Sequence, residues 1–139
     1  MRLPDWQTRF SRFGQERARA PFVWGTNDCC MHAAAAVEAI TGTNPMAAFE
    51  SYGTEAGPRR KALRRLLRQL DKVGGLQALV TAHMGEPIRP VMATVGDVVL
   101  VRNEGRELLA ICNGVNAMGP GRDGMVSLSM QDALAAWRV

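Results

Sequence analysis

The order of two hydrophobic periodicities constrains the fold of this chain most. Before Pro90, apolar residues recur every three to four positions, which is typical of amphipathic helices. After Pro90, the segments VMATVGDVVLV, ELLAIC, GVNAMG and GMVSLSM are short β-like runs separated by Gly, Asn and Asp. Helices followed by strands predict an α+β domain, with N-terminal helices packed on a small C-terminal antiparallel sheet. A last helical turn is expected in MQDALAAW.

The N-terminal helix is predicted over about residues 5–19. Trp6, Phe10 and Phe13 lie at positions i, i+4 and i+7 and form one apolar stripe. We expect this stripe to face the core. A further helix is expected from Pro58, and a shorter one places Leu76 and His83 on the same face.

Residues 22–42 contain the second predicted helix in chain order, with boundary signals at both of its ends. Asn27 or Asp28 can accept the first free N–H groups of a helix, and Gly42 suits the left-handed position that ends one. The stretch between them is rich in alanine. We therefore expect this helix to pack closely on more than one side.

Size and composition predict one globular domain over residues 1–139. Apolar residues make up 47% of the chain and charged residues 22%, and a chain of this length buries a sizeable core. Three cysteines, Cys29, Cys30 and Cys112, are too few for a disulfide framework and suit a reducing compartment. No apolar run is long enough to predict membrane insertion, and the first 21 residues lack the apolar core of a secretory signal. Synthesis in a cytoplasm is the expectation.

The net charge of +4 comes mainly from one basic run. Its members are Arg59, Arg60, Lys61, Arg64, Arg65, Arg68 and Lys72. A solvated helix face is the favoured interpretation, because no aromatic residues that could stack on bases interleave with these side chains. A small basic nucleic-acid-associated protein is the alternative that this run leaves open.

Cys29 is the first candidate for chemistry. A thiol is nucleophilic as the thiolate, and the N-terminus of a helix favours that anion. The negative charge of Asp28 opposes this effect. From the residues alone, a reactive thiol and a small apolar packing residue both remain open. The spacing of Asp28, Cys29, Cys30 and His32 matches no common zinc arrangement, so we expect neither a metal nor a cofactor.

Two motifs resemble the NlpC-type family of papain-like cysteine peptidases. Phe22-x-Trp24-Gly25-x-x-Asp28-Cys29 is similar to the entry of that family's nucleophile helix. The run GDVVL at residues 96–100 is similar to the Gly-Asp-Leu-Val-Phe strand that opens the family's sheet. The resemblance implies that Cys29, rather than Cys30, stands at the nucleophile position.

The same resemblance implies an incomplete catalytic site. The family's general base is a histidine, and Leu108 is aligned with it here, whereas Asn116 is aligned with the residue that orients the base. Leucine cannot transfer a proton, so hydrolysis is expected to be lost or weak. His32, one helical turn after Cys29, is a weak candidate for a substitute base. His83 is expected to be a hydrogen-bonded histidine of the core or its boundary.

The chain also resembles a family of short proteins encoded among phage tail genes. The shared features are the Trp-Gly-x-x-Asp-Cys helix start at residues 24–29, TGTNP at residues 41–45, the Gly-Asp-Val-Val strand and the terminal tetrapeptide Ala136–Val139. This implies a tail-tip or baseplate component of the virion, made in the host bacterial cytoplasm. It would contact tail hub and distal tail proteins. An active endopeptidase or amidase that degrades host peptidoglycan during DNA entry is the alternative.

Overall fold

The helices α1, α2 and α5 precede the sheet in this computed structural model, which describes residues 1–47, 64, 68, 70–72 and 74–139. The helices are α1 (Trp6–Arg17), α2 (Cys29–Thr41) and α5 (Leu76–Met84), with short 3-10 turns η2 (Pro90–Met92) and η3 (Met130–Asp132). The strands are β1 (Val98–Asn103), β2 (Arg106–Cys112), β3 (Ala117–Gly121), β4 (Gly124–Leu128) and β5 (Ala133–Trp137). The predicted α+β class is confirmed.

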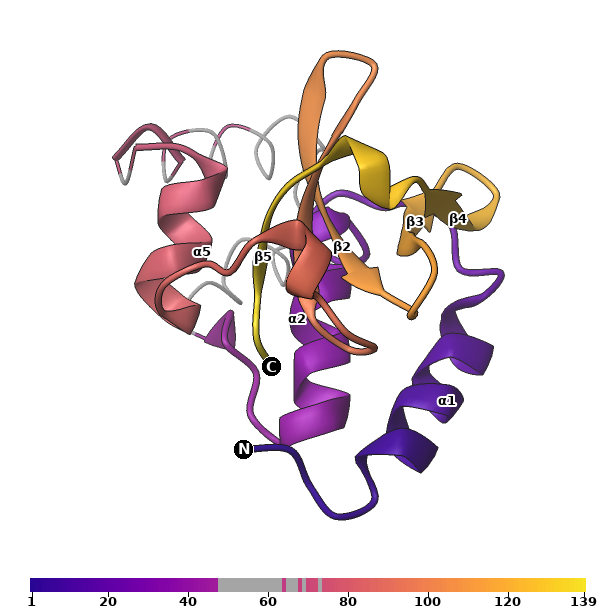
Figure 1. Cartoon of the computed structure of the whole chain (residues 1–139). Helices are drawn as coiled ribbons and strands as arrows, with labels where there is room; N and C mark the ends of the chain where they lie inside the picture. The colour runs from indigo at the N-terminus through magenta and orange to yellow at the C-terminus, as the bar shows by residue number, and fades with distance from the viewer. Residues whose placement is uncertain (48–63, 65–67, 69, 73) are drawn as a thin grey trace.

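The five strands form one antiparallel sheet in the order β4-β3-β2-β1-β5 (Figure 1). The central pair, β1 and β2, is in register over its whole length, from Val98 opposite Ile111 to Asn103 opposite Arg106. By contrast, β3 joins β2 through only two residue pairs, Ile111 with Met118 and Cys112 with Ala117. Among the described residues, β3 therefore leaves the earlier part of β2 unpaired on that side.

Local signals determine both ends of α2. The Asp28 carboxylate accepts a hydrogen bond from the N–H of Met31, and Gly42 adopts the left-handed conformation with its N–H bonded to the carbonyl of Glu38. The alanine-rich sequence then allows close packing, and Ala33, Ala34 and Ala36 are all buried. The predicted boundaries and packing of this helix are confirmed.

The two faces of the sheet bury different side chains. One face packs against α2 and α1 through residues that include Val98, Leu109 and Ile111. The opposite face carries a smaller cluster that includes Val99 and Ala110, and Ile88 and Met130, from two separate segments, pack against it. Two residues of the predicted α1 stripe face the larger cluster: Phe13 is buried in it and Phe10 packs against it. The third, Trp6, is half-buried outside this cluster, with the Arg2 guanidinium 4.1 Å from its ring.

The C-terminal segment corrects one expectation. The helical turn predicted in MQDALAAW is limited to η3, and Ala133–Trp137 form the edge strand β5 instead. Its partner is β1, with Val98 opposite Trp137 and Val99 opposite Ala136. Alanine favours helices, but pairing with an open sheet edge outweighs that preference.

The two chain ends lie side by side (Figure 1). The Nε of Arg2 donates a hydrogen bond of 2.9 Å to the carbonyl of Val139, and the Leu3 N–H donates one of 2.8 Å to the carbonyl of Ile40. Most of the helix expected from Pro58, and of the basic run within it, lies outside the described residues. In the described part of the chain, no helix combines the length and apolar character needed to cross a membrane.

Candidate functional site

The candidate site is built on the turn that leads into α2. Asp28 is fully buried, and its second carboxylate oxygen accepts a 2.8 Å hydrogen bond from the N–H of Gly25. Together with the Met31 bond of 2.9 Å, this fixes the direction in which α2 begins. Cys29 and Cys30 are consequently the first two residues of the helix, where unpaired N–H groups favour an anion.

Cys29 is half-buried as a residue, and the pKa of its thiol is lowered from the ordinary value. The largest cause is a hydrogen bond from the neighbouring Cys30 thiol, and a hydrogen bond from the backbone of Leu109 acts in the same direction. Burial and the charge of Asp28 oppose the shift. The same pairing raises the pKa of Cys30 well above its ordinary value, and burial adds to that rise. Cys29 is therefore the member of the pair that becomes a thiolate.

The residue of β2 that faces Cys29 is Leu109. Both belong to the apolar cluster between α2 and the sheet, whereas Leu108 packs in the cluster on the opposite face. Successive side chains of a strand point to opposite faces, so these two leucines cannot both face the helix. The alignment of Leu108 with a base facing Cys29 is therefore off by one residue. The facing position is still apolar.

Asn116 does not lie opposite the part of β2 that meets Cys29. It directly precedes Ala117, which pairs with Cys112, and Cys112 is three residues beyond Leu109, or about 10 Å along a strand. Its own N–H donates a 2.7 Å hydrogen bond to the Oδ1 of Asn113 within the β2–β3 loop. The structure thus gives Asn116 a place in a turn, away from Cys29.

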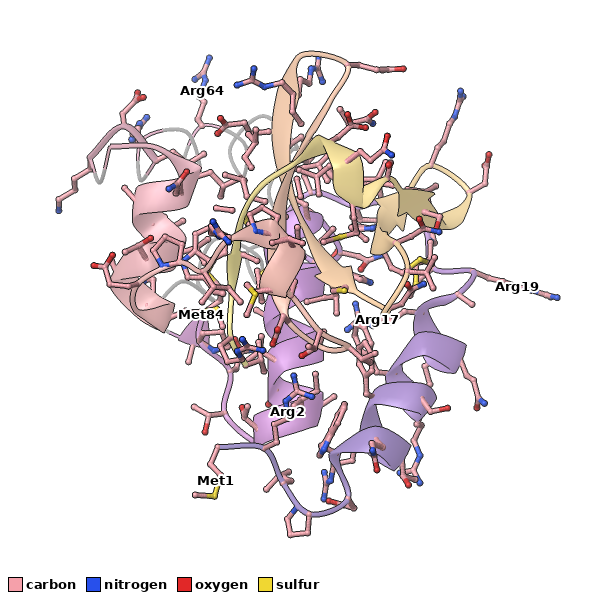
Figure 2. The ribbon with its side chains drawn as sticks, in the orientation of Figure 1. Met1, Arg2, Arg17, Arg19, Arg64 and Met84 are labelled. Carbon is pink, nitrogen blue, oxygen red and sulfur yellow. The ribbon has the colours of Figure 1, made fainter. Side chains whose placement is uncertain are left out.

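His32 is buried between α2 and α1. Its side chain is 1% exposed, and neither ring nitrogen has a hydrogen-bond partner among the described residues. The ring lies 5.1 Å from that of Phe13. Burial lowers the pKa of His32 to about 4, and the positive charge of Arg17 makes a smaller contribution. The Arg17 side chain lies against the molecule, whereas that of Arg19 projects away from it (Figure 2). His32 is a neutral group of the core at pH 7, and it forms no hydrogen bond to Cys29.

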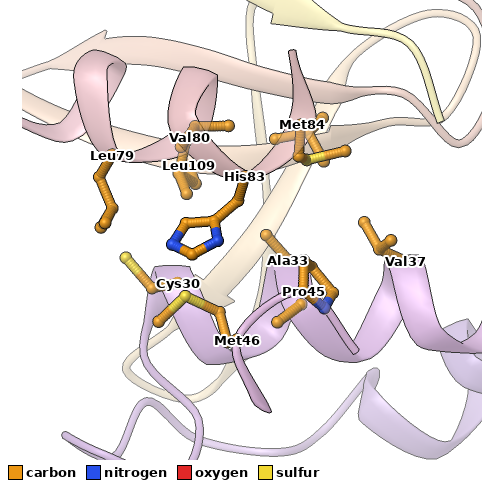
Figure 3. A pocket seen from close by; sticks show the side chains of 12 residues that line it. Cys30, Ala33, Val37, Pro45, Met46, Leu79, Val80, His83, Met84 and Leu109 are labelled. Carbon is orange, nitrogen blue, oxygen red and sulfur yellow. The ribbon is translucent and has the colours of Figure 1, made fainter. Parts of the chain in front are cut away.

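The structure places His83 and Cys30 around the same cavity, a proximity that the sequence did not predict. Both line a small cavity of about 30 Å³ between α5 and α2, with Leu109 at its wall. Figure 3 shows the His83 ring directed from α5 toward the start of α2, where Cys30 and Met46 lie. The helical periodicity placed His83 on the apolar face of its helix, but it could not show on which element that face packs. The His83 residue as a whole is exposed, at the edge of this cavity.

Comparison with known proteins identifies the family. The sequence-family model described as Domain of unknown function (DUF6950) matches residues 1–139. The chain belongs to this family. No curated protein matches the chain.

The chemistry available to this DUF6950 domain follows from its side chains. The start of α2 can hold a thiolate at Cys29, stabilised by the Cys30 thiol and the Leu109 backbone. The side chain opposite is a leucine, which can neither accept nor return a proton. Within the described ranges, no three His, Cys, Asp or Glu residues come together in a way that could hold a metal ion.

Proposed function

We propose that this chain is a structural component of a phage tail tip or baseplate, built on an NlpC-like cysteine peptidase fold whose catalytic site is incomplete. It acts by contacting tail hub and distal tail proteins in the virion, to which it is added after synthesis in the host cytoplasm. The tail assignment rests on the sequence resemblance of residues 41–45, 96–99 and 136–139. The loss of catalysis rests on the geometry of the site.

One observation carries the proposal: the residue facing Cys29 is apolar. A helix that begins with cysteine and packs its first turn on an antiparallel sheet is the arrangement that the peptidase resemblance implies. In such a site a base must lie within hydrogen-bond reach of the sulfur. Here Leu109 occupies that position and contributes only its backbone. Loss of a base in a hydrolase typically lowers the rate by about four to six powers of ten.

An exposed apolar patch supports a role in protein contacts. We define this patch as Val91, Met92, Val95 and Val115, which are 81%, 53%, 37% and 76% exposed. A side chain built at Gly114 would come within 3.0 Å of Val95, so the η2 segment and the β2–β3 loop are neighbours. Exposed groups of large apolar side chains commonly mark interaction surfaces.

The test of lost catalysis is release of soluble fragments from purified peptidoglycan. Wild type and Cys29→Ala are compared, with an active NlpC-type peptidase as the positive control. The proposal expects no release from either protein. Release by the wild type and not by Cys29→Ala would overturn it.

The test of the structural role is assembly of tail particles. Cys29→Ala is expected to leave incorporation and infectivity unchanged, whereas Val115→Asp in the patch should lower incorporation. Val126→Asp is the matched control, because Val126 is 42% exposed on β4 and lies outside the patch. Equal incorporation of Val115→Asp and Val126→Asp would remove the patch from the proposal. Loss of infectivity in a folded Cys29→Ala variant would contradict the structural role itself.

The second candidate is an active peptidoglycan hydrolase, and the lowered pKa of Cys29 favours it. A low thiol pKa is a feature of cysteine nucleophiles. This function would need a base that approaches the sulfur only when substrate binds. The peptidoglycan assay separates the two candidates directly.

A further inference from the structure

His32 lies beneath α1 in a position where its charged form finds no partner. Its side chain is 1% exposed, and neither ring nitrogen has a hydrogen-bond partner among the described residues. The ring lies against that of Phe13 on α1, with the centroids 5.1 Å apart. Protonation would place a cation in the interior between α1 and α2, and a buried charge without a partner is strongly disfavoured.

The charged groups around His32 do not offset this cost. Arg17 of α1 carries the same charge as a protonated His32 and already disfavours that form. Asp28, at the start of α2, is bonded to two backbone N–H groups. The other charged side chains within α1 are exposed, and those of the sheet that share a pocket with His32 are uncharged. These residues are Arg9, Arg12 and Glu16 on α1, and Ile111, Met118 and Met125 on the sheet.

Of the two helices that enclose His32, α1 is the more weakly held. Seven residues of α2 are buried, whereas Phe13 is the one buried residue of α1. A pocket of about 240 Å³ also lies between α1 and the sheet, and atoms that line a void lack contacts on that side. Consistently, a Cβ built at Gly14 within α1 would meet no atom within 4 Å. Moving α1 outward therefore breaks fewer contacts than moving α2.

The N-terminal end of α1 is anchored away from His32. The Leu3 N–H donates a 2.8 Å hydrogen bond to the carbonyl of Ile40, near the far end of α2. The Arg2 guanidinium also lies 4.1 Å from the Trp6 ring. His32 precedes Ile40 by eight residues, which is about 12 Å along a helix. A charge on His32 therefore leaves this anchor in place.

The C-terminal end of α1 lies beside His32 and is held by two hydrogen bonds. Arg17 Nη1 donates one of 2.9 Å to the Oδ1 of Asn27. The Met125 N–H of β4 donates one of 3.0 Å to the carbonyl of Ala18, directly after the helix. A cation at His32 would repel Arg17, so this is the end of α1 that a proton on His32 acts on.

We propose that α1 is an acid-sensitive lid: protonation of His32 lifts the end of α1 near Arg17 away from the sheet, while the end near Leu3 stays in place. Lifting admits water to the ring and uncovers the apolar side chains of the sheet beneath it. The sheet and α2 keep their structure. This inference does not depend on the proposed tail function or on the fate of the cysteine site.

The size of the effect follows from the two environments of His32. With α1 in place, the pKa of His32 is about 4, whereas a hydrated histidine has a pKa of about 6.5. Between these values the open form binds more protons than the closed form, so the ratio of open to closed molecules rises as the pH falls. From pH 7 to pH 5 this rise is about 20-fold.

The experiment measures amide hydrogen exchange of the full chain by NMR at pH 7 and pH 5, with each rate divided by the intrinsic rate at that pH. The Met125 amide reports on the end that lifts, and the Val99 amide, inside the sheet, reports on global unfolding. At Met125 the ratio of open to closed molecules should rise about 20-fold from pH 7 to pH 5 and stay nearly constant up to about 1 M urea. At Val99 the ratio should be smaller and should increase with urea. Equal ratios with equal urea dependence at the two amides would overturn the proposal, because α1 would then open only with the whole fold.

Two further measurements test the role of His32 itself. His32→Phe keeps an aromatic ring against Phe13 but cannot titrate, so the rise at Met125 should disappear, and an unchanged rise would contradict the proposal. In the wild type, the Hε1 resonance of His32 should titrate near pH 4. Titration near pH 6.5 without faster exchange at Met125 would mean that the closed form accepts the proton, which also overturns the lid. A urea-independent rise at the Leu3 amide, equal to that at Met125, would contradict an anchored N-terminal end.

Discussion

His32 places a titratable ring where its charged form has no stabilising partner. Its pKa of about 4 in the folded chain lies below the ordinary histidine value of about 6.5. Between these values the unfolded chain binds more protons than the folded chain, so the free energy of unfolding decreases as the pH falls. The contribution of neutral His32 to the free energy of unfolding is fully present above pH 6.5, and it is lost as the pH falls from 6.5 to 4.

We predict that this group alone lowers the free energy of unfolding by about 2 kcal/mol between pH 7 and pH 5. His32→Phe removes the titration and should show a correspondingly flatter pH dependence. Urea unfolding of both proteins at pH 7, 6 and 5 measures the difference, and the carboxylates that they share cancel from it. Parallel pH profiles for the two proteins would mean that folding does not lower the pKa of His32.

The lowered pKa of Cys29 also has a local cause, in the residue that follows it. Because the Cys30 thiol is the main cause of the lowered Cys29 pKa, we predict that Cys30→Ala raises the pKa of Cys29. Cys30→Ser retains a hydroxyl donor and should keep that pKa below the alanine variant's. The pH dependence of iodoacetamide alkylation, read at Cys29 by peptide mass, gives both values. Identical profiles for wild type, serine and alanine variants would exclude the hydrogen bond as the cause.

At the scale of elements, the orientation of β2 decides what Cys29 faces. An imidazole at position 109 would face the sulfur, and its cationic form would lower the pKa of Cys29. We therefore predict that Leu109→His accelerates Cys29 alkylation severalfold at pH 6, whereas Leu108→His does not. Thermal unfolding of both variants controls for the polar group introduced into an apolar surrounding. A larger acceleration in Leu108→His would reverse the assignment of the two faces.

The same element shows where sequence-based prediction stops. Asp28 and Gly42 are local signals, and they were enough to predict both ends of α2. The pairing of a strand is not local, and a shift of one residue moves every side chain to the other face. This is why Leu108 was aligned with a position that Leu109 holds, and why Asn116 was aligned with a site it does not reach. The strand β5 was missed for a related reason, since its alanines become a strand only beside β1.

At the scale of the whole molecule, two sequence motifs that lie far apart meet at one carboxylate. Asp97, next to β1, accepts hydrogen bonds from Arg2 Nη2 at 3.1 Å, from the Thr94 N–H at 2.9 Å and from the Val139 N–H at 3.0 Å. Arg2 and Val139 bond to Oδ1 and Thr94 bonds to Oδ2, and Arg138 Nη1 lies 3.5 Å from Oδ2. The Gly-Asp strand motif and the terminal tetrapeptide therefore have a shared structural role, which the sequence alone did not reveal.

The final prediction tests whether this carboxylate joins the two chain ends to the sheet. Asp97 is fully buried, so its removal leaves backbone N–H groups of the interior without an acceptor. We predict that Asp97→Ala lowers the free energy of unfolding by about 3 kcal/mol, with little of this from the half-exposed Arg138. Asp97→Asn keeps one acceptor oxygen and should therefore lower the free energy of unfolding by less than Asp97→Ala does. Urea unfolding measures both.

Asp123→Ala provides the matched control, because Asp123 is exposed in the turn between β3 and β4. Its removal should change the stability by no more than about 0.5 kcal/mol. In Asp97→Ala, amide exchange should also accelerate at Leu3 and Val139, the residues nearest the two ends that donate hydrogen bonds in this region. If Asp97→Ala were no less stable than Asp123→Ala, the chain ends would be held by packing around the buried Trp137 instead.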